Sequence, residues 1–166
     1  MPEKQTLEAA ARDKRAGKSA STQAGEFVRE EMHHIREGKH GARSTKQAIA
    51  IGLSKARRAG VALPAPAPGT TTEATRRAAQ HDLETGHHTG HPVSRKRARA
   101  TMSALQREGH SAASRRALAR QAKSAAKRRG PAARAAAAQK AIRTKGPARM
   151  SAAARKAAQT RARRGH

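Results

Sequence analysis

The sequence predicts an all-α protein with a short helical hairpin as its head, a Pro-rich linker, and Gly-punctuated short basic helices in a largely disordered tail. Between the glycines, most residues are strong helix formers, mainly Ala, Arg, Lys, Gln and Glu. No stretch alternates apolar and polar residues with a period of two, so we expect no strands. Glycines commonly follow basic residues where these stretches end, which is typical of helix C-termini.

Charge is distributed unevenly along the 166 residues, whose net charge is +26. Residues 1–63 hold 13 basic and 7 acidic residues, residues 64–90 have a net charge of −1, and residues 91–166 hold 22 basic residues and one acid, Glu108. We therefore expect a helical head over residues 1–63, a Pro-rich linker with a short helix over residues 64–90, and a basic Ala/Arg/Lys-rich tail over residues 91–166.

Bulky apolar residues are concentrated in the head, where their spacing predicts two helices. The first covers residues 22–37 and the second residues 45–59, and each places its apolar side chains on one stripe. Ser44 and Gln47 fit a capping box at the start of the second helix, and the short loop before it suits an antiparallel pair. A further helix over residues 7–16 precedes them. We expect one core made of Phe27, Val28, Met32, Ile35, Ile49 and Leu53.

The run ALPAPAPG at residues 62–69 leads from the head into the linker, and its alternating prolines favour an extended polyproline conformation. The residues after it have the composition of one short helix. Thr70 and Glu73 fit a capping box at the start of that helix.

The tail lacks the bulky residues from which a core is built. Its apolar residues are mostly Ala, which buries little of the area that yields roughly 25 cal/mol per Å². Gly109, Gly130 and Gly146 divide it into units of a degenerate repeat, and isolated helices this short are marginal in water. We expect the tail to be largely unfolded alone and to gain helix on a polyanion. The alternative is that the tail is a solvated low-complexity segment whose apparent repeat has no structural meaning.

The block EFVREEMHHIREGKHGARSTKQAIAIGLSKARRAGVALP, at residues 26–64, resembles the shared core of a family of small basic bacterial proteins of unknown function. Members of that family are often labelled DNA-binding or histone-like. The resemblance implies a bacterial source and brings no established activity, fold or catalytic residue. The tail is similar in composition to linker-histone tails.

The excess of Lys and Arg predicts a protein that binds a polyanion, and duplex DNA is the expected partner. Specific base reading has few candidates, because only Lys46 and Gln47 stand near the start of the second helix. We expect phosphate neutralisation without sequence readout, as in a nucleoid-associated protein. Two alternatives stay open: an RNA- or ribosome-associated basic protein, and a protein-docking head that its tail localises.

The residues expected to contact the nucleic acid are the basic residues of the tail and three from the second head helix. They are Arg95, Lys96, Arg97, Arg99, Arg115, Arg116, Arg120, Lys123, Lys127, Arg128, Arg129, Arg134, Lys140, Arg143, Lys145, Arg155, Lys156, Arg161, Arg163, Arg164, Lys55, Arg57 and Arg58.

Other classes of function find little support in the sequence. The chain has no GxSxG, Walker or HExxH motif, so we expect neither an enzyme nor a cofactor. One aromatic residue cannot supply the stacking platforms of single-strand binding. No apolar run is long enough to cross a membrane and no secretory leader is evident, so we expect a cytoplasmic, nucleoid location. The oligomeric state stays open.

Histidines form two groups in the sequence, and neither is expected to hold a metal ion. The first comprises His81, His87, His88 and His91, with Asp82 and Glu84 nearby, and the second comprises His33, His34 and His40. The first group lies in a Gly-rich region, whereas a zinc site needs three or four ligands on a defined scaffold. The expected role of these histidines is a gain of positive charge below about pH 6.5.

Overall fold

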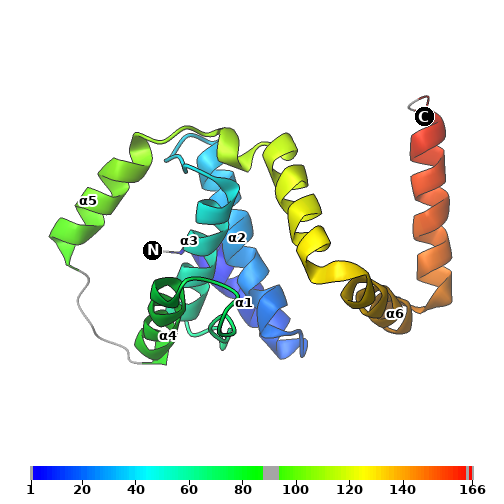
Figure 1. Cartoon of the computed structure of the whole chain (residues 1–166), viewed down its shortest axis with the longest axis horizontal. Coiled ribbons are helices and arrows are strands. Elements are labelled where there is room, and N and C mark those ends of the chain that lie inside the picture. The colour runs from blue at the N-terminus through cyan, green and yellow to red at the C-terminus, as the bar shows by residue number, and fades with distance from the viewer. Residues whose placement is uncertain (1, 88–93, 164, 166) are drawn as a thin grey trace. The chain divides into compact units, whose positions relative to one another are not determined.

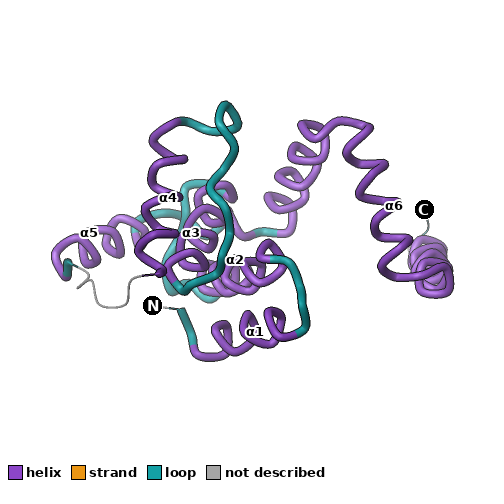
Figure 2. Tube along the Cα trace, turned by 90° about the horizontal axis from the view of Figure 1, so that it is seen from below, coloured by secondary structure: helices purple, strands orange, loops and turns teal. Residues whose placement is uncertain are grey.

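The computed structural model describes residues 2–87, 94–163 and 165, and within them the protein is all-helical, as predicted. Figure 2 shows helices joined by loops, with no strand in the described part of the chain. In chain order the helices are α1 (Lys4–Arg15), α2 (Ala20–Arg36), α3 (Thr45–Arg58), α4 (Glu73–His87), α5 (Arg95–Gln106), the 3-10 helix η1 (Ser111–Ala113) and α6 (Arg115–Arg163). Residues 1–121 form one compact unit and residues 122–166 form a second. The division into head, linker and tail at residues 63 and 90, which was expected from charge, stays a prediction.

Helices α2 and α3 run in opposite directions and pack against each other (Figure 1). The Ser44 side chain caps α3 by accepting a hydrogen bond of 3.2 Å from the Gln47 backbone N–H, which confirms the predicted cap. Gly52 lets the two helices approach closely, because a Cβ at this position would lie 2.7 Å from the Cα of Val28. The absence of a side chain at Gly52 therefore sets the spacing of the hairpin.

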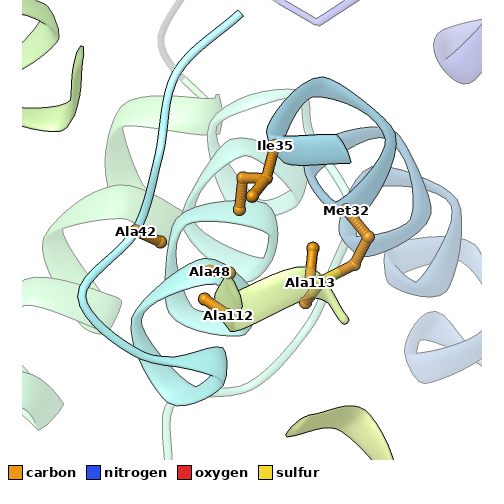
Figure 3. Close-up of a cluster of buried hydrophobic side chains, with 6 residues drawn as sticks. All are labelled: Met32, Ile35, Ala42, Ala48, Ala112 and Ala113. Carbon is orange, nitrogen blue, oxygen red and sulfur yellow. The ribbon is translucent and has the colours of Figure 1, made fainter. Parts of the chain in front are cut away.

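The core consists of two small clusters, so the prediction that all six apolar residues pack in one cluster is wrong. Phe27 and Ala56 belong to one cluster, against which Leu53 packs. Met32 and Ile35 belong to the other, against which Val28 and Ile49 pack. Alanines fill much of the remaining space in both clusters, which is why the core accommodates few large side chains. The second cluster, shown in Figure 3, comprises Met32, Ile35, Ala42, Ala48, Ala112 and Ala113.

Helix α1 packs on α2, and α4, which lies in the segment expected to be the linker, packs on α3. Asp82 of α4 accepts a hydrogen bond from the Ser54 hydroxyl and pairs with Arg58, whose Nε lies 3.4 Å from Oδ1. The Thr72 hydroxyl accepts a hydrogen bond from the Thr75 N–H at the start of α4. The hydroxyl that caps α4 is therefore that of Thr72, whereas the sequence predicted Thr70 as the capping residue.

The segment between α5 and α6 is docked on the head, although the sequence places it in the tail. Ala112 and Ala113 are buried in the second core cluster. Thr45 Oγ1 donates to the Ala112 carbonyl at 2.7 Å, and Arg36 Nε donates to that of Ala113 at 2.9 Å. Two backbone hydrogen bonds add to this, because the N–H of Gly41 donates to Leu105 and that of Ala42 donates to Gly109.

The expected largely disordered tail is not supported, because α5, η1 and α6 account for most of its described residues. The high helix propensity of Ala, Arg and Lys outweighs the repulsion between like charges three and four residues apart. In the second unit, α6 is interrupted at Gly130 and Gly146, which have φ values of 74°. Pro131 and Pro147 follow these glycines and open new helical turns, as the sequence indicated.

Candidate nucleic-acid interface

The tail candidates carry exposed side chains wherever the structure describes them. This holds for the first turns of α5, for the start of α6 and for the part of α6 in the second unit. The side chains of Lys145 and Arg164 lie outside the described part. The exposed candidates are Arg95, Lys96, Arg97, Arg99, Arg115, Arg116, Arg120, Lys123, Lys127, Arg128, Arg129, Arg134, Lys140, Arg143, Arg155, Lys156, Arg161 and Arg163.

These cations have no acidic partners nearby in the sequence. Residues 109–166 contain no Asp or Glu, and Glu108 is the one acid of the tail. Accordingly, no ion pair with a carboxylate is found for these side chains among the described residues. Their charge is therefore available to an external anion.

Part of the charge in the second unit follows one face of the helix. Arg149, Lys156 and Arg163 are spaced by seven residues, so they drift by only about 20° per step around the helix. Successive members of this row, which we call the 149–163 stripe, are separated by about 10 Å along the axis. Arg149 is exposed and was not among the predicted contact residues, although its heptad spacing to Lys156 is visible in the sequence.

Helix α5 presents a second group of cations, at its N-terminus. Arg95, Lys96, Arg97 and Arg99 lie in its first two turns, and the Ser94 side chain accepts a hydrogen bond from the Arg97 N–H at 3.4 Å. Cations are unfavourable at this end, because the helix dipole and the unpaired N–H groups already make it positive. An anion bound there would relieve this repulsion.

The three candidates on α3 are engaged within the head. Arg57 is 6% exposed, and its guanidinium donates to the carbonyls of Leu63 and Pro64 at 3.1 Å each. Desolvation lowers the pKa of Arg57, and the nearby charge of Asp82 opposes that shift. Arg58 is about half exposed and pairs with the same aspartate.

Lys55 is also turned inward, with its side chain 19% exposed. Its Nζ lies 2.7 Å from Glu31 Oε2 and 3.6 Å from Glu30 Oε1.

Gln47, a candidate for base reading, is also engaged: its side-chain carbonyl accepts a hydrogen bond from the Arg43 N–H at 2.8 Å. The structure thus does not gather these side chains into an exposed basic face on α3.

A cleft of about 410 Å³ lies between α1 and α2, and its charge is mixed. Glu3 accepts hydrogen bonds from His34 and Lys39, which hold the pKa of Glu3 below its usual value. The same contact with Glu3, together with one to Glu37, raises the pKa of Lys39. A cleft that pairs its own charges in this way has little attraction for a polyanion. It is lined by Glu3, Gln5, Thr6, Ala9, Arg12, Glu26, Arg29, Glu30, His33, His34, Glu37 and Lys39.

Residues 12–66 match the model of a family whose description is "Family of unknown function (DUF6496)". The matched segment includes α2 and α3 and is less than half of the chain. It overlaps the block at residues 26–64 whose resemblance to a family of unknown function was noted, and it carries no DNA-binding or histone-like description. No curated protein and no solved structure matches the chain. None of the described helices is both long enough and apolar enough to cross a membrane.

Proposed function

We propose that the protein binds duplex DNA without reading its sequence, by neutralising phosphates with the exposed cations of α5 and α6, as a nucleoid-associated protein does. One observation carries the proposal: cations stand on exposed helices in a stretch without acids. Each cation that meets a phosphate releases condensed counterions, and this release drives association.

Duplex DNA is favoured over single strands because the described surface offers no aromatic platform. Phe27 is the one aromatic residue of Phe, Tyr and Trp type in the sequence, and it is buried in the core. Single-strand binding depends on stacking bases against such side chains. Phosphates at regular spacing on a stiff duplex suit rows of cations at fixed spacing on a helix, such as the 149–163 stripe. Structured RNA also presents rows of phosphates, so the test below includes RNA as a competitor of duplex DNA for the protein.

A salt titration of the affinity for unrelated duplexes tests the proposal, with the full chain compared with a chain that ends at residue 121. Residues 122–166 contain 14 Lys and Arg residues. If one side of each helical stretch meets phosphates, about seven contacts form, and the full chain's plot of log affinity against log salt is steeper by about 6. Equal slopes, or a strong preference for one duplex, would contradict phosphate neutralisation by the second unit.

A matched pair of charge variants separates the 149–163 stripe from overall charge. Replacing Arg149, Lys156 and Arg163 by Gln should make the slope shallower by about 3, at roughly 0.9 per lost contact. Replacing Lys4, Lys14 and Arg15 of α1 by Gln changes the net charge equally and should leave the slope nearly unchanged. If ribosomal RNA displaces duplex DNA at equal phosphate concentration, the partner is RNA.

A further inference from the structure

Three side chains of metal-ligand type meet inside the head. Glu31 and His34 are three residues apart on α2 and therefore share one face of the helix. His40 reaches them from the loop between α2 and α3. One ligand atom from each residue lies within 4.8 Å of those of the other two. Glu31 is fully buried and the His40 side chain is 5% exposed.

Glu31 brings a buried negative charge that the surrounding side chains do not fully satisfy. Lys55 Nζ lies 2.7 Å from Oε2, and His40 Nε2 lies 3.3 Å from Oε1. Both contacts are ion pairs by distance. Neither carboxylate oxygen of Glu31, however, accepts a hydrogen bond of good geometry among the described residues. Glu30 is also buried and shares the same Lys55, so two carboxylates face one ammonium group. An uncompensated buried charge is costly, so a further positive charge is favoured at this position.

If each imidazole is neutral, its hydrogen bond indicates which ring nitrogen carries the single proton. His40 Nδ1 lies 3.1 Å from the Gly41 carbonyl, which can only accept, so Nδ1 is the donor. In the neutral ring, Nε2 then presents a lone pair toward Glu31 Oε1, which is itself an acceptor. Two acceptors facing each other repel, and a cation between them relieves this repulsion: either a proton, which makes an imidazolium–carboxylate pair, or a metal ion. His34 Nε2 donates to the Glu3 carboxylate at 2.8 Å, which leaves Nδ1 of His34 as its lone-pair nitrogen.

This arrangement matches the second shell of metal-binding histidines, in which one ring N–H donates to a carboxylate or a backbone carbonyl. Glu3 supplies the carboxylate and Gly41 supplies the carbonyl. One ligand, His34, also lines the cleft between α1 and α2, together with Glu3 and Glu30. Two imidazole nitrogens and one carboxylate oxygen form a ligand set that suits Zn²⁺, with a further coordination position left for water.

We propose that Glu31, His34 and His40 bind one divalent transition-metal ion, of which Zn²⁺ fits the ligand set best. The proposal revises the expectation that these histidines hold no metal, because a helix and a docked loop supply the scaffold that sequence spacing did not reveal. The ion would join α2 to the loop whose Gly41 and Ala42 hold residues 105–113. The site does not depend on the proposed binding of DNA.

The test uses the full chain in which His81, His87, His88 and His91 are replaced by Asn, so that the other histidine group cannot bind zinc. We expect one equivalent of Zn²⁺ to bind, to raise the melting temperature, and to shift the ¹⁵N resonance of His40 Nε2. His40→Asn and Glu31→Gln should abolish binding. Glu3→Gln, a positioning variant at an exposed residue, should weaken it by about 10–100-fold. Glu8→Gln, at an exposed residue of α1, is the matched control and should bind normally.

His40→Asn or Glu31→Gln could fail to fold. In that case the ring resonances of His40 in the chain with an intact site, and the comparison of Glu3→Gln with Glu8→Gln, still decide the test. Loss of zinc binding when the four other histidines are replaced would show capture by that group and overturn the proposal. A His40 ring that carries protons on both nitrogens and does not respond to zinc would also overturn it, because a proton would then occupy the position assigned to the metal. Equal affinities of the Glu3→Gln and Glu8→Gln variants would refute the assigned ligand geometry.

Discussion

Gly41→Ala tests whether the segment between α5 and α6 is held by the head. The loop carrying Gly41 approaches the backbone of this segment so closely that a Cβ on Gly41 would overlap the carbonyl of Glu108. The atoms in the way are backbone atoms, which cannot move aside by a side-chain rotation. The alanine methyl group must therefore push residues 105–113 away from α2 and α3.

The expected cost follows from the hydrogen bonds that this displacement breaks first. The N–H of Gly41 donates to Leu105 at 2.9 Å, and the N–H of Ala42 donates to Gly109 at 3.1 Å. A backbone hydrogen bond contributes about 0.5–1.5 kcal/mol net, so loss of both lowers the free energy of unfolding by about 1–3 kcal/mol. Complete undocking would cost more, because it would also expose Ala112 and Ala113.

Urea denaturation measures this loss, and hydrogen exchange at the Ala42 amide reports on docking directly. Gly25→Ala is the matched control, because a Cβ at this exposed position in α2 meets nothing within 4 Å. It should stabilise the helix by about 0.5–1 kcal/mol, since Gly is a poor helix former. If Gly41→Ala unfolds at the same urea concentration as the parent and the Ala42 amide stays protected, residues 105–113 are not docked as described.

Three further predictions follow from contacts of α2, α3 and α4. Phe27→Ala should lower the free energy of unfolding by about 3–5 kcal/mol, measured in urea, because Phe27 is buried. Arg57→Met should cost about 1.5–3 kcal/mol through lost hydrogen bonds to two carbonyls, yet leave the affinity for DNA in filter binding unchanged. The hydrogen bond from Arg76 lowers the pKa of Glu73 from its usual 4.5, so this pair stabilises the protein above that pH and the contribution is lost as pH falls through the lowered pKa. The urea midpoints of parent and Glu73→Gln should therefore differ at pH 7 and converge in acid.

The first three helices were predictable because their signals are local. Apolar periodicity located α2 and α3, and the pair Ser44 and Gln47 indicated where α3 begins. The docking of residues 105–113 was not predictable in the same way. Ala112 and Ala113 fill space between helices that are distant in sequence, and alanine carries no periodic signal of burial in so Ala-rich a segment.

The candidate site was predictable to a different degree in each part of the chain. Exposure of the tail cations follows from composition, because a segment with 22 basic residues and one acid cannot pair them internally. The orientation of Lys55 and Arg57 was missed, since helix spacing alone does not reveal partners on α2 or in the linker. The adjacent acids Glu30 and Glu31 in a helix with an apolar face were the available signal, because buried carboxylates require cations nearby.

The pairing of charges within the head supports the proposal that the rest of the chain binds the polyanion. Seven of the 11 acids belong to residues 1–63, and several engage cations of that segment, including Lys18 with Asp13, Arg29 with Glu26, and Lys39 with Glu3. If every acid in the protein were paired, 26 positive charges would still lack a partner within the chain. Most of these charges lie on helices that have no acids beside them. They therefore repel one another unless an external polyanion compensates them, and association with such a partner is favoured because it relieves that repulsion and releases counterions.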